Sequence, residues 1–349
     1  MRVVVVGGRG NFGARICRSL AADRDLEVLP TGRRELDVTA ASFPSVLAAL
    51  APRVVVHCAG PFQGQDYRVA EASIAAGAHY LDLADGRSFV ANFASALDAR
   101  AKSAQVLALS GASTLPALSS AVIDSVADKF DELREVWISI APGQRAPRGA
   151  ATLAAVFSYL GRPFTWLSDG TWRDAWGWQE LRRIRFAGAG TRWGAACDVP
   201  DLMLLPRRYP TLQTVEFRAA LELGIQHFAL WLAAALRRRG VPLPLERWAG
   251  ALDVAASLLN IFAGDRGGML VTVAGRSAGR DKRVTWHLTV PALHGPEIPS
   301  IAAALLARRL AHGELSSTGA SACMGFLTLA DFEPEFSRWS ISTTLEESE

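Results

Sequence analysis

A glycine-rich segment near the N-terminus has the spacing of a phosphate-binding loop. Residues 7–13 read GGRGNFG, which places Gly8, Gly10 and Gly13 in the pattern G-x-G-x-x-G. Glycines at this spacing let the chain turn sharply between a strand and a helix, and they let backbone amides approach a pyrophosphate closely. The free amides and the positive end of the helix dipole then stabilise the phosphates. We therefore expect a dinucleotide site whose loop residues are Gly7, Gly8, Arg9, Gly10, Asn11, Phe12 and Gly13.

The residues after the second predicted strand indicate which dinucleotide is bound. An NAD site usually has an acidic residue there, which accepts hydrogen bonds from the ribose hydroxyls. Here the sequence is Thr31-Gly32-Arg33-Arg34, and Glu27 lies at the other end of the strand. A carboxylate would repel a 2′-phosphate, whereas arginine binds it with charge-assisted hydrogen bonds. These four residues favour NADP; the alternative is that Arg33 and Arg34 are solvent-facing loop charges.

The elements that must position these residues follow from the hydrophobic pattern. Apolar runs at 3–6, 26–30, 54–58, 80–83 and 106–109 alternate with helical stretches at 10–22, 41–50, 65–76 and 90–103. This alternation predicts an α/β fold with an N-terminal doubly wound Rossmann domain. Strand patterns return at 134–141, 214–218, 269–274 and 283–290, mixed with helices, which predicts an α+β second domain. The polar tail from Thr343 is expected to be frayed.

Composition excludes several classes of function. The 349 residues carry a net charge of only +3, which argues against nucleic acid as a partner. The four cysteines form no C-x-x-C pair and the six histidines no H-x-x-x-H pair, so we expect no disulfide framework and no metal site. Scattered cysteines fit a reducing compartment, and the first apolar run is too short for a signal peptide. We therefore expect a cytoplasmic protein.

Two apolar stretches, at 224–236 and 251–262, bear on membrane contact. Both are shorter than the ~20 residues that a spanning helix needs. Each also contains polar residues, among them His227 in the first and Asp253 in the second. We expect buried helices of the second domain or a dimer interface here, rather than membrane contact.

The segment 54–89 resembles the NADP-binding domain of the saccharopine dehydrogenase family. The shared features are AGPF at 59–62, QG at 63–64, GAHYLD at 77–82 and ALSGAS at 108–113 with Pro116, together with the glycine-rich loop and Thr31-Gly32-Arg33. The resemblance implies that Cys58, Ala59, Gly60, Pro61 and Phe62 lie beside the nicotinamide end of the cofactor. It also implies that Ser110 and Gly111 close the same crevice from the next strand.

The resemblance further implies how the chain is divided and what it does. The Rossmann domain would comprise residues 1–130 and a returning segment at about 293–330, which contains a predicted helix at 296–313. Residues 131–292 would form the α+β substrate and dimerisation domain of a homodimer. The implied activity is that of an NADP-dependent oxidoreductase, which transfers hydride to or from a small amine, imine or carbonyl compound in the cleft between the domains.

No motif in the sequence identifies the proton donor that such a reaction needs. None of the four tyrosines is followed by lysine at the fourth position, which excludes the Tyr-x-x-x-Lys mechanism. Residues 275–279 match G-x-S-x-G but lie between two predicted strands, so they predict a hairpin and not a nucleophile elbow. The candidates for acid–base work are Asp82, Asp85 and His57. Strand-end aspartates can instead cap the next helix, and His57 can be a structural histidine.

Two other functions stay open at this point. The missing proton donor also fits an NADP(H)-binding sensor without turnover. The apolar stretches also fit a lipid- or membrane-associated Rossmann protein.

Overall fold

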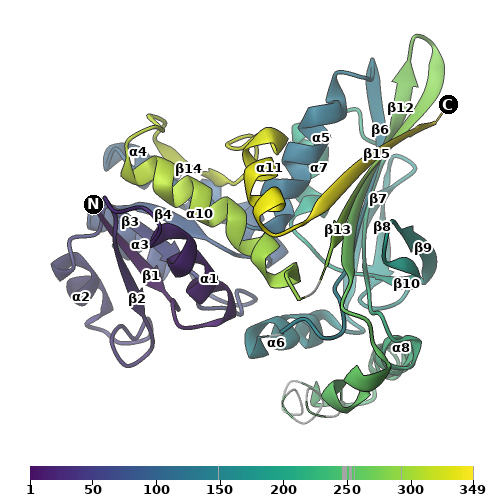
Figure 1. Cartoon of the computed structure of the whole chain (residues 1–349), viewed down its shortest axis with the longest axis horizontal. Coiled ribbons are helices and arrows are strands. Elements are labelled where there is room, and N and C mark those ends of the chain that lie inside the picture. Colours follow the sequence, from purple (N-terminus) through teal and green to yellow (C-terminus); the bar gives the residue numbers. More distant parts are fainter. Residues whose placement is uncertain (148, 246–249, 251–253, 255, 292, 349) are drawn as a thin grey trace. The chain divides into compact units, whose positions relative to one another are not determined.

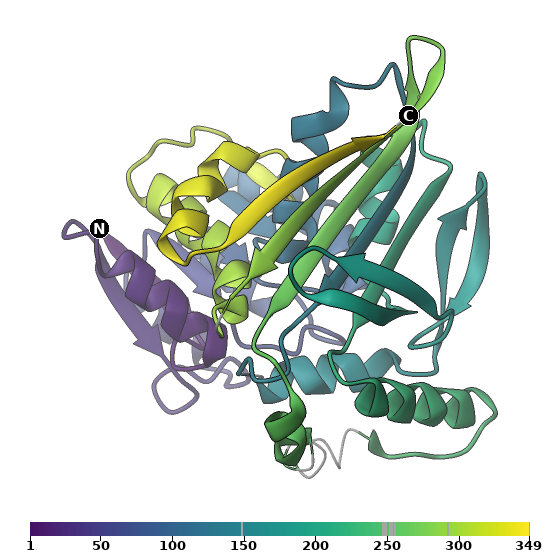
Figure 2. The ribbon, with the colours of Figure 1, turned by 45° about the vertical axis from the view of Figure 1, so that its right-hand side comes forward.

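The computed structural model describes residues 1–349 apart from 148, 246–249, 251–253, 255, 292 and 349. This part of the chain forms two compact units. The first unit contains Met1–Leu118 and Pro296–Leu327, and the second contains Ser119–Gly295 and Thr328–Glu349. Each unit is built on a sheet with helices packed against it (Figures 1 and 2). The predicted fold class, a Rossmann-like α/β sheet with a second sheet domain, is confirmed.

The first unit has a six-stranded parallel sheet in the order β14-β5-β4-β3-β1-β2. Its strands are β1 (Arg2–Val6), β2 (Glu27–Thr31), β3 (Val54–His57), β4 (His79–Asp82), β5 (Leu107–Ser110) and β14 (Gly319–Ala322). The central strands are apolar at successive positions because both faces of the sheet are covered. The strand order reverses at β1, since β2 pairs with one side of it and β3 with the other. Ligands of such sheets bind outside the carboxyl ends of the strands at this switch point.

The helices of the first unit are α1 (Asn11–Leu20), α2 (Phe43–Ala49), α3 (Arg68–Ala75), α4 (Arg87–Ser103), the short turn η1 (Thr114–Leu118) and α10 (Ile298–Ala311), which follows the turn η3 (Gly295–Glu297). Helix α10 comes from the returning part of the chain and packs beside α1 and against β1, β3 and β4 (Figure 1). A largely buried ion pair, in which Arg15 Nε lies 3.0 Å from Glu297 Oε1, links α1 to the start of α10. Helix α1, which begins after the glycine-rich loop, is therefore held in place both by the N-terminal part of the chain and by the returning part that contains α10.

The second unit has a nine-stranded sheet in the order β15-β13-β12-β6-β11-β10-β9, with β7 paired to both β11 and β8. Its strands are β6 (Glu132–Ala141), β7 (Pro163–Ser168), β8 (Thr171–Trp176), β9 (Arg182–Phe186), β10 (Gly190–Ala196), β11 (Thr214–Ala220), β12 (Gly267–Ser277), β13 (Arg280–Val290) and β15 (Ser342–Ser348). Strands β6 and β11 are parallel, and the other described pairs are antiparallel. Residues 275–279 lie in the β12–β13 hairpin, as predicted.

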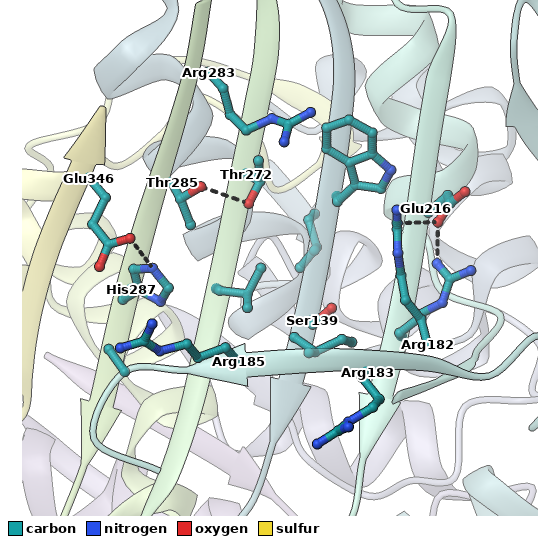
Figure 3. Close-up of a pocket in the computed structure, with 16 residues that line it drawn as sticks. Ser139, Arg182, Arg183, Arg185, Glu216, Thr272, Arg283, Thr285, His287 and Glu346 are labelled. Carbon is teal, nitrogen blue, oxygen red and sulfur yellow. Dashed lines mark hydrogen bonds and ion pairs between the residues drawn. The ribbon is translucent and has the colours of Figure 1, made fainter. Parts of the chain in front are cut away.

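The two faces of this second sheet differ in polarity. Its helices are α5 (Ser119–Ala127), α6 (Ala150–Tyr159), α7 (Asp201–Arg208), α8 (Gly224–Arg238), η2 (Leu259–Phe262) and α11 (Leu329–Arg338). Buried side chains of β13 such as Trp286 point to the face that α5 and α11 cover, where Trp286 packs near Phe336 of α11. The alternate positions, among them Thr285 and His287, point to the other face, which β9 crosses (Figure 3). We call this second side the open face.

Two expectations from the sequence are wrong in detail. The tail from Thr343 is not frayed, because β15 pairs along its length with β13. Residues 224–236 form a helix of the second unit, α8, but its apolar side chains Ile225, Phe228 and Leu232 are exposed, so the expected burial is wrong and the alternative, a dimer interface, stays a prediction. Of the second apolar stretch, residues 251–253 and 255 lie outside the described residues, while Leu258 is exposed. In the described parts of the chain, every helix is too short or too polar to cross a membrane.

Candidate dinucleotide-binding site

The glycine-rich loop turns directly from β1 into α1. Gly7 has a φ of +77°, and a Cβ there would lie 2.9 Å from the backbone nitrogen of Ala59. At Gly8, a Cβ would lie 2.7 Å from Pro30 Cα, and at Gly13 it would collide with the carbonyl oxygen of Gly7. Larger residues are therefore excluded by backbone on three sides. Gly7 lies against the segment after β3, Gly8 against β2, and Gly13 against the loop itself.

The first turn of α1 offers amides to an anion. Gly10 is the N-cap residue of the helix and has no side chain that could accept its hydrogen bonds. Its own amide donates to the carbonyl oxygen of Gly7 at 2.9 Å, which closes the loop. The positive end of the helix dipole is therefore directed at the carboxyl edge of the parallel sheet.

The segment after β2 contains an acidic residue that the sequence analysis did not consider. Glu35 Oε2 accepts a hydrogen bond from the Gly32 amide at 2.9 Å, and Glu35 Oε1 lies 2.7 Å from the Arg9 guanidinium. The hydrogen bond from Gly32 holds the pKa of Glu35 below its usual value. Thr31, by contrast, is buried, and its hydroxyl donates to the carbonyl oxygen of Val5 at 3.2 Å. An amide, a guanidinium and a carboxylate thus meet where a ribose 2′-substituent is expected.

The segment after β3 is held by glutamine side chains. Gln65 Nε2 donates to the carbonyl oxygens of Ala59 at 2.9 Å and Pro61 at 2.7 Å, and the Gly60–Pro61 peptide bond is cis. The Cys58 amide donates to the carbonyl oxygen of Val6 at 2.8 Å, so the segment starts level with the glycine-rich loop. Sequence reasoning noted the neighbouring QG pair only as a family feature; these bonds show that Gln65 fixes the turn.

Asp82 is fully buried at the end of β4 and joins it to the end of β5. Its Oδ1 accepts hydrogen bonds from the Ser110 hydroxyl at 3.0 Å, the Gly111 amide at 2.8 Å and the Ala84 amide at 2.9 Å. Burial raises the pKa of Asp82 to about 6, although these hydrogen bonds act in the opposite direction. Asp82 therefore holds in place the segment that contains Ser110 and Gly111.

The other two acid–base candidates have different surroundings. His57 is buried, its Nδ1 lies 3.1 Å from the Tyr80 hydroxyl, and its ring packs edge-on against Phe62. Burial lowers the pKa of His57 to about 4, so the ring is neutral near pH 7. Asp85 is exposed and accepts a hydrogen bond from Gln63 Nε2 at 3.0 Å. Asp85 is thus the most exposed residue of the three, although burial around its carboxyl raises its pKa above the usual value, against the effect of the bond from Gln63.

The register of the sheet brings these segments to one edge. Val6, His57 and Asp82 are aligned across β1, β3 and β4. Because the strands are parallel, the glycine-rich loop and the segments after β2, β3, β4 and β5 all leave the sheet on the same side. This is the arrangement of a nucleotide-binding edge at a topological switch point.

Comparison of the fold with solved structures finds saccharopine dehydrogenase (L-Glu forming) from Saccharomyces cerevisiae, with a TM-score of 0.65 over 100% of both chains at 12% identity. The chain has a saccharopine dehydrogenase-like fold. An engineered D-amino acid dehydrogenase bound to NADP+ also matches, with a TM-score of 0.50 over 96% of this chain and 98% of that one at 16% identity. No family model and no curated protein matches the sequence. The resemblance predicted from the sequence is thus confirmed for the fold.

Proposed function

We propose that this saccharopine dehydrogenase-like protein is an NADP(H)-dependent oxidoreductase acting on a small amine, imine or carbonyl compound. The observation that carries the proposal is the contact between the glycine-rich loop and the segment after β3. A Cβ at Gly7 would lie 2.9 Å from the Ala59 nitrogen, so the cradle for a pyrophosphate and the turn for a nicotinamide are adjacent. The cofactor supplies the hydride chemistry, and the protein supplies binding and orientation.

The residues of this edge fit a dinucleotide. The amides at the start of α1 would bind the pyrophosphate, because the amides of Gly8 and Gly10 already donate to backbone carbonyl oxygens and shape the loop. The segment from Cys58 to Phe62, with Ser110 and Gly111, would bind the nicotinamide end. Asp82 would act as a positioning residue, because its carboxyl bonds to both Ser110 and Gly111. Asp85, exposed beside Gln63, is the carboxylate that we propose for proton transfer.

The preference for NADP rests on the charges at the end of β2. Arg33 and Arg34 follow Gly32 directly in the sequence, and the Arg9 side chain lies beside Gly32 in space, since a Cβ at Gly32 would lie 3.4 Å from Arg9 Cδ. The Glu35 carboxylate already occupies two donors there, the Gly32 amide and Arg9. We propose that Glu35 is a stand-in anion, which a 2′-phosphate with its larger charge displaces. An NADH ribose has no such charge and would leave the Glu35 contacts in place.

Turnover is tested by following the absorbance of NADPH as it is oxidised with small keto acids, each supplied with and without ammonia. The proposal is supported if NADPH is oxidised only in the presence of a substrate, and if Asp85→Asn slows this oxidation without changing the affinity for NADPH. The alternative, a sensor without turnover, is favoured by the burial of Asp82 and His57. Tight NADPH binding without oxidation of any substrate would select that alternative.

The exposed apolar side of α8 supports a homodimer. Ile225, Phe228 and Leu232 recur on one side of the helix and are exposed. A surface of this kind is typical of a contact between proteins or with lipid. Sedimentation of the wild type and of Leu232→Glu tests this proposal. A dimeric wild type and a monomeric Leu232→Glu variant would support the homodimer. A monomer that floats with liposomes would support the lipid-associated alternative.

A further inference from the structure

The second unit contains a pocket of about 370 Å³ on the open face of its sheet. It lies between β9, which crosses this face, and strands β6, β11, β12 and β13 (Figure 3). All of its lining residues belong to the second unit, so the pocket is distinct from the dinucleotide-binding edge. Its volume falls in the range of about 300–1,000 Å³ typical of small-molecule sites.

The pocket follows from alternation along the strands. On β13, residues 284, 286 and 288 are buried toward the helices, so Arg283, Thr285 and His287 point to the open face. Strand β9 is anchored to the same face by Ile184 and Phe186, which pack in a small apolar cluster with Leu270. The arginines that flank these anchors are thereby held at the pocket.

Positive charge exceeds negative charge in the lining. Five arginines line the pocket, against two glutamates. One of these, Glu216, is already paired with Arg218 and with Arg182, the latter at 3.6 Å. The Arg283 guanidinium packs over the Trp137 ring, 5.2 Å from its centre. Arg183, Arg185 and Arg283 have no carboxylate partner among the described residues, which leaves three of the five guanidinium groups uncompensated.

A buried histidine of the same pocket makes no hydrogen bond with any residue that the structure describes. His287 is 7% exposed, and neither of its ring nitrogens has a hydrogen-bond partner in the described part of the chain. Its Nε2 lies 3.6 Å from Glu346 Oε2, which is within ion-pair distance but longer than a hydrogen bond (Figure 3). Buried polar groups are nearly always hydrogen-bonded, so these two nitrogens point to a missing partner. The hydroxyls of Thr272 and Thr285, 3.0 Å apart, add two further polar groups nearby.

We propose that this pocket binds a small multivalent oxyanion. Uncompensated guanidinium groups bind carboxylate or phosphate oxygens through paired, charge-assisted hydrogen bonds. A histidine nitrogen and threonine hydroxyls can donate to the remaining oxygens. The positive excess inside a partly enclosed pocket attracts anions and raises their local concentration. The ligand class is a metabolite that carries two or more phosphate or carboxylate groups, and it binds independently of the dinucleotide.

The test is calorimetric titration of the full-length protein with pyrophosphate and, separately, with citrate, at constant ionic strength. Saturable binding of one ion per chain is expected for at least one probe, and the probe that binds tells which oxyanion the pocket prefers. Arg283→Gln is expected to weaken the binding of that probe by about tenfold or more, because it removes a charge-assisted hydrogen bond. Arg283→Lys, which keeps the charge but loses the paired geometry, should give an intermediate affinity.

Arg173→Gln is the matched control, because it removes the same charge from an exposed residue of the same unit, paired with Asp169. It is expected to leave binding unchanged. Each variant is checked for an unaltered unfolding temperature and, in a separate titration, for unaltered NADPH affinity. No saturable binding of either probe, or equal weakening by Arg173→Gln, would overturn the proposal. Loss of ion binding in the presence of NADPH would also overturn the proposal, because it would place the ion at the dinucleotide site. A change of oligomeric state in Arg283→Gln without any ion binding would overturn it as well.

Discussion

The buried carboxyl of Asp82 makes the stability of the first unit depend on pH in a direction that can be calculated. Burial raises the pKa of Asp82 to about 6, against an ordinary value of ~3.9 for an aspartate. The folded chain therefore binds more protons than the unfolded chain between about pH 4 and pH 6. In that window the free energy of unfolding falls as the pH rises, because ionising a buried carboxyl disfavours the folded state.

The size of this effect follows from the pKa difference. A difference of ~2 pKa units corresponds to ~3 kcal/mol. The contribution to the free energy of unfolding is complete below about pH 4 and is lost by about pH 6 to 7. Asp82→Asn keeps an oxygen that can accept the bonds from Ser110, Gly111 and Ala84 but has no charge. The variant should therefore gain ~3 kcal/mol relative to the wild type between pH 4 and pH 7.

Asp82→Ala is the contrasting variant. It leaves the three buried donors without their acceptor, at a cost of about 1–3 kcal/mol for each donor left unpaired. This variant should be less stable than the wild type at every pH, and most clearly so below pH 5. The pair of variants separates the hydrogen bonds of Asp82 from its charge.

The distribution of tryptophan makes the assay specific for each unit. All ten tryptophans lie in the second unit, so their fluorescence follows that unit in a urea titration. Far-ultraviolet circular dichroism follows both units. We expect Asp82→Asn to alter the pH dependence of the circular dichroism transition and to leave the fluorescence transition unchanged. Parallel pH profiles for wild type and Asp82→Asn in both signals would refute the reasoning.

Three further predictions concern the glycine-rich loop, the Glu35 carboxylate that competes with a 2′-phosphate, and the C-terminal strand β15. The Cβ added by Gly13→Ala would collide with the Gly7 carbonyl. This variant should lower the free energy of unfolding, measured by thermal unfolding, by about 1–3 kcal/mol and abolish NADPH binding. Gly224→Ala, where the Cβ enters open space, is the control and should do neither. Glu35→Gln should raise the ratio of NADPH to NADH affinity in calorimetry by about two- to fivefold; a lower ratio would contradict the stand-in role. Deleting residues 342–349 removes β15 from β13 and should lower the midpoint of the fluorescence transition; an unchanged midpoint would show that the strand adds nothing.

The first unit could be predicted because its signals are local. Continuous apolar runs mark strands buried on both faces, and the glycine spacing marks the loop between β1 and α1. The second unit gave weaker signals, and β7 to β10 were missed. One signal was available: Asp169-Gly170, with φ of +50° and +74°, forms the turn of the β7–β8 hairpin. An Asp-Gly pair between two apolar stretches is a strong hairpin signal.

Other features depend on partners distant in sequence. Strand β15 is exposed at every position, so it has no alternation to detect and forms through backbone pairing with β13. The burial of Asp82 depends on Ser110 and Gly111, which belong to a different strand. The role of Glu35 depends on its side chain folding back onto Gly32. The open-face pocket requires β9 to cross a sheet whose strands come from four other parts of the chain.

The most direct test of the central claim is a calorimetric titration of the wild type and Arg33→Ala with NADPH and with NADH. We predict tight NADPH binding, much weaker NADH binding, and a loss of NADPH affinity of about tenfold or more in Arg33→Ala with little change for NADH. Arg100→Ala, an exposed arginine of the same unit paired with Glu71, is the matched control and should behave as the wild type. Binding of neither nucleotide by the wild type would contradict the proposed oxidoreductase function.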